Sequence, residues 1–439
     1  MTMDATVNQT LDDYWMPFTA NRAFKADPRI LARAEGVHYW NDRGEKLIDG
    51  VSGLFTTPCG HGRREIAEAV AAQVTALDFA PPFQFGTPGA FRLATEIAKL
   101  TPEGMNKIFF GNSGSEAVES AIKIAIQYHR RRGEAQRQRI VGREKAYHGV
   151  NFAGWSVGGM VKNREQFGLG MPGVSHIRHT QQDFSLKTTG QAETGADLAD
   201  DLQRQIDLYG ADTIAACIVE PISGSVGILV PPKGYLERLR KICSDNGILL
   251  IFDEVITGFG RTGKAFAAQS FGVTPDLMTM AKAITNGNIP MAAVAVQDDV
   301  YHAIVDNSPD AIEFLHGYTW SASPIACAAS LATLKIYHDE ELFSRAEAAS
   351  PGFLARVEDL AATMPVVTGV RGYGLLAGID LAQGEKPGSR GFATLKALYA
   401  AGAVLRVTND TIILAPSFIM TDNDYDQLFD TLKSVLSAI

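Results

Sequence analysis

Short apolar runs alternate with longer amphipathic stretches through the middle of the chain. Four of these runs have the length and composition of buried strands: RQRIVGRE, TIAACIVEP, ILLIFDE and DLMTMA. Helical apolar spacing marks the stretches between them, as in GYLERLRKICSDNG. Because strands that alternate with helices form a parallel sheet with helices on both faces, this part of the chain predicts an α/β fold with a mostly parallel sheet.

Both ends of the chain depart from this alternation. The stretch GVHYWNDRGEKLIDG alternates apolar and polar residues around NDRG, which predicts a hairpin. Beyond about residue 335, long helices precede GLLAGIDLA, the strand pair AVLRVT and TIILAPSF, and a closing helix from Asp422. We therefore expect one large domain (51–334) beside a smaller α+β domain (335–439), with an N-terminal segment (1–50) that joins the smaller one.

Composition and charge indicate a globular protein that acts on small molecules. The chain has 439 residues, of which 46% are hydrophobic and 20% charged, and its formal net charge is −9. A chain of this charge lacks the broad positive field that nucleic acids or anionic membranes require, so we expect neither as a partner. The polar, acidic start and the absence of a long apolar segment predict a cytoplasmic protein.

The cysteines and histidines show no metal-ligand spacing. Cys59, Cys217, Cys243 and Cys327 are far apart, and we expect them to be reduced and structural. His176 and His179, in HIRH, form the one local histidine pair, and without a nearby cysteine or carboxylate cluster they predict a surface loop. We expect no metal.

The stretch GFGRTGK, residues 258–264, fits the dinucleotide-binding pattern GxGxxG and all but the last position of the P-loop pattern GxxxxGK(S/T). A P-loop requires Ser or Thr after the lysine, but position 265 is Ala, and its acidic strand must be a separate strand of the sheet. In a dinucleotide site the first glycine directly follows the strand, whereas here DEVIT intervenes. The glycines therefore predict backbone turns, with Arg261 and Lys264 in supporting positions.

Asp253 and Lys282 are the two candidates for chemistry at the edge of the sheet. Asp253 ends the apolar run ILLIFD, and open α/β sheets bind ligands at the carboxyl ends of their strands. A buried carboxylate requires a partner, and the protonated ring nitrogen of pyridoxal phosphate is one possibility; a helix cap or a surface pair is the alternative. Lys282 follows the next strand, in an apolar context that favours the nucleophilic form of an amine, although most lysines are solvated surface groups.

Two further stretches could complete such a site. GNSGSE opens a helix directly after the strand MNKIFF, so Ser113, Gly114 and Ser115 could bind a phosphate dianion at the positive end of that helix. An ordinary serine N-cap is the alternative. Tyr147 and His148, in KAYHGVN, follow the strand RIVGRE and could reach the same edge, or could simply pack.

These residues belong to a long signature that resembles the class III (omega) aminotransferases of the aspartate aminotransferase fold, which is fold type I of the enzymes that use pyridoxal phosphate. The signature spans essentially the whole chain and includes SGSEA, YHG, VEP, IFDEVITGFGRTG, TPD, AKAITNG and GYTWSASPIACAA. By this resemblance, Lys282 binds the cofactor covalently and moves the proton, and Asp253 pairs with the ring nitrogen. Ser113, Gly114 and Ser115 resemble the phosphate site, and Tyr147 the residue stacked on the ring.

The resemblance implies further roles. Val255 would lie beneath the ring, with His148 and Glu220 near it. Thr319 resembles the residue that reaches the phosphate of a neighbouring subunit, which implies a homodimer with shared active sites and leaves pairing into a tetramer open. Within the class, WMPFTANR, HGVNFAGWSVGG and LRVTNDTIILAPSF are most similar to beta-alanine (omega-amino acid):pyruvate aminotransferases.

The subgroup resemblance concerns the substrate pocket. Arg406 occupies the place of an arginine that receives the substrate carboxylate and swings aside for amines that lack one; a surface strand residue is the alternative. Phe18, Phe55 and Phe85 are candidate pocket walls, although each could belong to the core. Phe55 replaces a frequent Trp, and Ile256 replaces the Gln common in the acetylornithine and 4-aminobutyrate branches.

The resulting hypothesis is transamination from a beta-alanine-like amine to pyruvate, with pyridoxal 5'-phosphate as cofactor. Two alternatives stay open at this point. One is another class III reaction, such as 4-aminobutyrate or diaminopelargonate transamination. The other is a nucleotide-dependent enzyme built on GFGRTGK.

Overall fold

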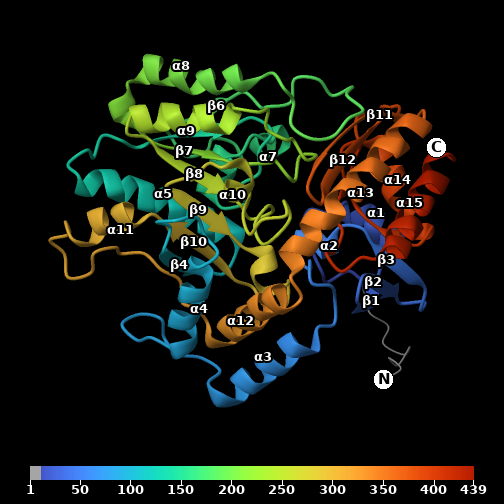
Figure 1. Ribbon diagram of the computed structural model, residues 1–439, viewed down its shortest axis with the longest axis horizontal. Helices are drawn as coiled ribbons and strands as arrows, with labels where there is room; N and C mark the ends of the chain where they lie inside the picture. The colour runs from blue at the N-terminus through green and yellow to red at the C-terminus, as the bar shows by residue number, and fades with distance from the viewer. Residues whose placement is uncertain (1–10) are drawn as a thin grey trace.

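The computed structural model of the protein describes residues 11–439, and a seven-stranded sheet lies at its centre (Figure 1). Strands β5 to β9 pair in parallel, and β10 is antiparallel to both of its neighbours, β9 and β4. The strand order is β4 (Lys107–Gly111), β10 (Ala292–Val296), β9 (Leu277–Met280), β8 (Leu249–Asp253), β7 (Ile214–Val219), β5 (Arg139–Arg143) and β6 (Val174–Ile177). The prediction of a mostly parallel α/β sheet is confirmed.

Side chains of this sheet alternate between two apolar cores, one on each face. In β8, Leu249 and Ile251 pack in one core, and Leu250 and Phe252 pack in the other. The first core contains the apolar stripe of α5 (Gly114–Arg131) and residues of α6 (Phe152–Val157) and α11 (Asp298–Val305). The second contains α8 (Asp200–Tyr209), α9 (Tyr235–Asp245) and α10 (Ala267–Phe271). This coverage of both faces explains why the strands are apolar throughout.

The N-terminal strands and the C-terminal part of the chain lie together beside the large sheet. β1 (Leu31–Glu35), β2 (His38–Asn41) and β3 (Lys46–Asp49) form an antiparallel sheet, which confirms the hairpin around NDRG. β13 (Ala403–Val404), from the C-terminal part, pairs in parallel with β3. The blue N-terminal strands accordingly lie against the orange and red elements in Figure 1. This pairing is of the kind expected if residues 1–50 join the C-terminal domain. The domain boundaries themselves stay a prediction.

The C-terminal part builds its own antiparallel sheet, flanked by helices. Its strand order is β11 (Val367–Tyr373), β12 (Leu376–Leu381), β15 (Thr411–Leu414) and β14 (Arg406–Thr408). The flanking helices are α13 (Leu342–Thr363), α14 (Ser389–Ala400) and α15 (Asp422–Leu436). The strand pair and closing helix predicted there are confirmed, while β11 and β10 are two strands that the apolar pattern did not reveal.

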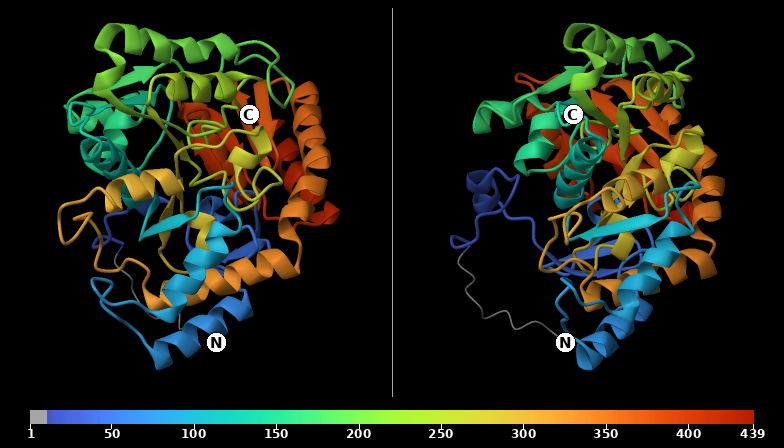
Figure 2. Two further views of the ribbon diagram at one scale, coloured as in Figure 1. Left: turned by 60° about the vertical axis from the view of Figure 1, so that its left-hand side comes forward. Right: turned by 90° about the vertical axis from the view of Figure 1, so that its left-hand side faces the viewer.

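Three helices pack together at one end of the molecule, α3 (Arg64–Ala76), α4 (Pro88–Ala98) and α12 (Pro324–Asp339) (Figure 2). The expected boundary between residues 334 and 335 lies inside α12. Short elements complete the fold: α1 (Asn21–Ala26), α2 (Ser52–Phe55), α7 (Val161–Phe167) and the single 3-10 turns η1 (Ala196–Ala199), η2 (Ala211–Thr213) and η3 (Lys282–Thr285). None of the helices in residues 11–439 is long and apolar enough to cross a membrane.

One local prediction is wrong in part. His176 lies within β6 rather than in a surface loop, because the apolar residues around it pair in parallel with β5, whereas His179 lies in the loop that follows β6. Its imidazole contacts the Arg164 guanidinium. Within residues 11–439 no cluster of three or more histidine, cysteine or carboxylate side chains could hold a metal ion.

Candidate active site

The carboxyl ends of five strands meet at one cavity. β4, β5, β7, β8 and β9 run in the same direction, so the residues that follow them converge at one edge of the sheet. The cavity has a volume of about 320 Å³. It brings together most of the candidates from the sequence: Ser113, Gly114, Ser115, Tyr147, His148, Glu220, Asp253, Val255 and Lys282.

Lys282 lies on this cavity at the start of η3, directly after β9. Its backbone is left-handed, with φ of 48°, a conformation that costs free energy for any residue with a Cβ atom. Burial lowers the pKa of the Lys282 amine to about 8, although Asp253 and Glu220 raise it, and the Arg406 cation lowers it further. A large share of this amine is therefore neutral, and so nucleophilic, near pH 8.

Asp253 is buried at the end of β8 and has three hydrogen-bond partners. His148 Nδ1 donates to Oδ2 at 2.7 Å, while the Val255 N–H and the Thr279 hydroxyl donate to Oδ1, each at 3.1 Å. The imidazole is a partner that the strand sequence alone could not supply. His148 Nε2, by contrast, is buried and has no hydrogen-bond partner among the described residues.

Glu220 fixes the backbone that carries Tyr147. Its carboxylate accepts from the Tyr147 N–H at 2.9 Å and from the Gly224 N–H at 2.8 Å. Burial raises the pKa of Glu220, and the nearby imidazole of His148 opposes that shift. Beneath it, the fully buried Arg143 donates to the Glu220 carbonyl oxygen and to the Ser223 hydroxyl. Glu220 thus supports the residues around the cavity through their backbone.

The segment GNSGSE forms the N-terminus of α5, as its motif predicts. The Ser113 hydroxyl accepts from the Glu116 N–H at 3.3 Å, so Ser113 is the N-cap. The Ser115 hydroxyl accepts from the Val150 N–H at 3.0 Å. A Cβ atom on Gly114 would lie only 3.0 Å from a methyl group of Val255, so glycine lets these two segments approach. The positive end of an 18-residue helix therefore points at the cavity, together with two hydroxyl groups.

The remaining candidates lie around this cavity rather than in its lining. Arg406 begins β14, close enough to Tyr147 and Lys282 to affect their pKa values, and its buried Nε has no hydrogen-bond partner among the described residues. Phe55 is buried, with its ring centroid 5.9 Å from Lys282 Nζ. Phe18 is 79% exposed and meets the Tyr147 ring edge-on at 6.4 Å. Phe85 is 70% exposed.

Thr319 is also exposed in the single chain and does not line the cavity. Of its two aromatic neighbours, Tyr318 is half-buried and Trp320 is 55% exposed. Phe79 packs on Trp320 with ring centroids 5.1 Å apart.

The glycine-rich stretch 258–264 is a structural turn, as predicted. Gly260 and Gly263 have φ of 102° and 89°, which glycine adopts without strain. Arg261 is fully buried, donates to the Pro416 carbonyl oxygen and lies 5.0 Å from the Phe418 ring. Lys264 is exposed and pairs with Glu347. Residues 258–264 therefore do not form the phosphate-binding loop that the nucleotide-dependent alternative requires.

Ile256, singled out because it replaces a common Gln, also lines the cavity. The sequence did not single out about half of the cavity lining. Most of these residues flank the predicted ones, in GNSGSE, YHG and the stretch after Lys282, and the motifs could have identified them. Thr56 comes from a distant segment, and no local pattern predicts it. The additional lining residues are Thr56, Asn112, Gly149, Ala281, Thr285, Gly287, Ile289, Pro290 and Met291.

These features fit pyridoxal phosphate. A lysine of low pKa, a buried carboxylate, a helix N-terminus with hydroxyl groups and a tyrosine face surround one cavity. The unpartnered Nε of Arg406 adds a free donor beside them. Each group suits one part of the cofactor. The lysine suits its aldehyde, the carboxylate its ring nitrogen, the helix N-terminus its phosphate and the tyrosine the face of its ring.

Comparison with known proteins agrees with this geometry. The family model described as aminotransferase class-III matches residues 20–436. An omega-aminotransferase of Caulobacter vibrioides is 48% identical over 98% of both chains. A beta-alanine–pyruvate aminotransferase of Pseudomonas aeruginosa is 45% identical over 97% of this chain and 96% of its own.

A solved structure extends the likeness to three dimensions. The amine transaminase from an uncultivated Pseudomonas species, solved in its PLP-bound form, superposes with a TM-score of 0.90 at 32% identity. The match covers 97% of this chain and 98% of that one. The protein belongs to the class III aminotransferases.

Proposed function

We propose that the protein transfers an amino group from an omega-amino acid or primary amine to pyruvate. The products are alanine and the corresponding aldehyde, ketone or oxo acid. The observation that carries this proposal is the convergence of Lys282, Asp253 and the α5 N-terminus on one cavity. The relatives named for omega-amino acids and for beta-alanine and pyruvate support the choice of substrates.

Pyridoxal phosphate, when bound, supplies an electron sink and carries the amino group between donor and acceptor. In our proposal, Lys282 would hold the cofactor by its aldehyde and would then carry a proton to and from the donor carbon. Asp253, fixed by His148, would keep the ring nitrogen protonated, because a buried carboxylate stabilises an adjacent cation. Val255 and Tyr147, whose backbone is held by Glu220, line the cavity and would contact the ring.

Ser113, Gly114 and Ser115, at the N-terminus of α5, would hold the phosphate with backbone N–H groups and hydroxyls. Tyr147, Phe55 and Arg406 would surround the substrate, with Phe18 and Phe85 farther out. Arg406 binds the carboxylates of beta-alanine and pyruvate.

We propose a homodimer as the active unit. Exposed aromatic side chains lie near Thr319: Trp320, which follows it, is 55% exposed, and the Phe83 ring, beside Gly317, belongs to a side chain that is 53% exposed. Exposed apolar side chains of this kind favour a protein interface. In a dimer, Thr319 reaches the phosphate in the partner subunit, which explains why it lies outside the cavity of its own chain.

The direct test of this function is pyruvate-dependent turnover. The purified protein, saturated with pyridoxal phosphate, is supplied with pyruvate and with beta-alanine, 4-aminobutyrate or 1-phenylethylamine, and alanine is measured. We expect alanine with beta-alanine at a kcat/KM at least about tenfold above that with 4-aminobutyrate, since one extra methylene in a fitted pocket costs about this factor. A protein that forms no alanine with any of the three donors contradicts the proposal.

The rate of cofactor uptake will depend on pH through Lys282. Only the neutral amine attacks an aldehyde, and burial lowers the pKa of Lys282 to about 8. Uptake of pyridoxal phosphate by the apoprotein therefore rises from pH 7 to 9, with a midpoint near pH 8. Stopped-flow measurement of visible absorption reports this rate. A rate that still climbs steeply at pH 10, as expected for an exposed lysine, contradicts the assignment.

A further inference from the structure

The turn that carries Lys282 has a left-handed residue at each end. Lys282 and Asn286 both have left-handed backbones, with φ of 48° and 49°. Asn tolerates this conformation, but a lysine adopts it only when its surroundings leave no alternative. Two side-chain hydrogen bonds hold the turn. The Tyr337 hydroxyl donates to the Ala283 carbonyl oxygen at 2.8 Å. The Thr285 hydroxyl donates to the Ile289 carbonyl oxygen at 2.6 Å.

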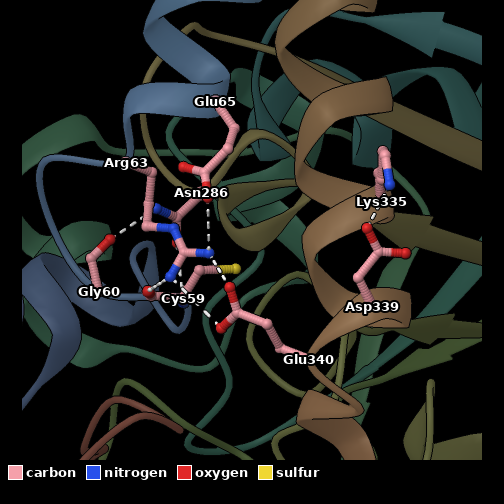
Figure 3. Close-up of polar contacts among 8 residues, drawn as sticks. All are labelled: Cys59, Gly60, Arg63, Glu65, Asn286, Lys335, Asp339 and Glu340. Atoms are coloured by element: carbon pink, nitrogen blue, oxygen red, sulfur yellow. Dashed lines mark hydrogen bonds and ion pairs between the residues drawn. The ribbon is translucent and has the colours of Figure 1, made fainter.

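Asn286 links this turn to a distant part of the chain. Its Oδ1 accepts from the Cys59 N–H at 3.0 Å, and its Nδ2 donates to the Gly60 carbonyl oxygen at 2.9 Å (Figure 3). Asn286 is 2% exposed, so no water competes for these bonds. One amide thus satisfies the backbone of two adjacent residues.

The same segment is held from its other side. Arg63 Nη1 donates to the Cys59 carbonyl oxygen at 3.5 Å, and its guanidinium pairs with Glu340 at the C-terminal end of α12 (Figure 3). The backbone of residues 59 and 60 is therefore held by Arg63 as well as by the Asn286 amide.

The segment that Asn286 holds, residues 55–60, also contributes to the cavity and its surroundings. It includes Thr56, which lines the cavity, and Phe55, whose ring lies 5.9 Å from Lys282 Nζ. Phe55 is itself in a left-handed conformation, with φ of 63°, and is 1% exposed. The strained residues Phe55 and Lys282 therefore lie close together, and the Asn286 amide directly bridges the backbone segments that carry them.

We propose that Asn286 is a positioning residue that sets the distance between Lys282 and the Phe55 wall. This role rests on the proposed function of the cavity. Asn286 is not among the residues that line the cavity and acts through the two segments it joins. Loss of its amide lets the Lys282 turn relax and lets the Phe55 wall move, so cofactor capture and donor selectivity change together.

Three substitutions separate the contributions. Asn286→Gly keeps access to the left-handed backbone and removes both amide bonds. Asn286→Asp keeps the acceptor for Cys59 N–H and removes the donor to Gly60. Asn288→Ala is the matched control, because Asn288 is exposed in the same loop and, within residues 11–439, its side-chain amide donates only to the carbonyl oxygens of Thr285 and Asn286.

We expect Asn286→Gly to slow cofactor uptake by about tenfold, as displacement of a reacting group typically does. A lysine released toward solvent is less affected by desolvation and by Asp253, Glu220 and Arg406, so the pH midpoint of uptake rises by at least about half a pH unit. The ratio of kcat/KM for 1-phenylethylamine to that for beta-alanine changes by about threefold or more. Asn286→Asp shifts both quantities in the same direction by a smaller amount, and Asn288→Ala leaves them within about twofold.

A merely structural role predicts a different result. Lower stability reduces the amount of active protein, which urea unfolding measures, but moves neither the pH midpoint nor the selectivity ratio. Unchanged midpoint and ratio in both Asn286 variants overturn the proposal, whatever their stability. Failure of the proposed function itself is visible earlier, as wild-type protein that takes up no cofactor or forms no alanine.

Discussion

Lys282→Ala will lower pyruvate-dependent transamination at least about 10³-fold, since a positioned acid–base group alone contributes about 10² to 10⁴. Lys282 lies on the cavity directly after β9, and burial lowers its pKa to about 8, so it can both attack an aldehyde and carry a proton. Alanine formation with beta-alanine measures the loss. Borohydride reduction followed by mass measurement of the chain shows whether the cofactor is covalently attached, which we expect in the wild type and not in the variant.

Lys264→Ala is the matched control for this experiment. Lys264 belongs to GFGRTGK, the stretch that imitates a phosphate loop, and its amine is exposed and paired with Glu347. An exposed ion pair contributes about 1 kcal/mol or less to stability, so activity should stay within about twofold. Equal losses in the two variants, or ATP binding that disappears with Lys264→Ala, would restore the nucleotide-dependent alternative.

The parts of the site that sequence could predict are those that depend on strand ends. Asp253 ends the apolar run of β8. Lys282 follows closely after β9, and Ser113 follows closely after β4. In a parallel sheet such positions meet at one edge whatever the rest of the fold does. The turn 258–264 was equally predictable, because the two missing features of a phosphate site are visible in the letters of the sequence.

The parts that sequence could not predict depend on contacts between distant segments. His148 is the partner of Asp253, but the stretch KAYHGVN carries no pattern that predicts contact between its imidazole and the end of β8. The same holds for Thr56 on the cavity and for the amide of Asn286 on Cys59 and Gly60. The antiparallel strand β10 was also missed, because AAVAV is short and small side chains give a weak apolar signal.

Arg406→Ala will slow the reaction of carboxylate substrates by about 100-fold, because an unpaired buried charge or a lost charged hydrogen bond costs about 2 to 5 kcal/mol. Arg406 begins β14 close to Tyr147 and Lys282, burial lowers its pKa, and within residues 11–439 it makes no ion pair. The cofactor-loaded enzyme is mixed with beta-alanine alone, and the decay of visible absorption gives the rate of the first half-reaction. The second half-reaction, started with pyruvate, should slow by a similar factor.

The internal control is an amine without a carboxylate. The first half-reaction with 1-phenylethylamine should stay within about threefold of wild type, since Arg406 gains nothing from binding this donor and must move away from it. Arg406→Lys keeps the charge but loses the planar fork, so it should recover only part of the rate with beta-alanine. If Arg406→Ala slowed 1-phenylethylamine as much as beta-alanine, the arginine would be supporting the cavity wall and not selecting the carboxylate.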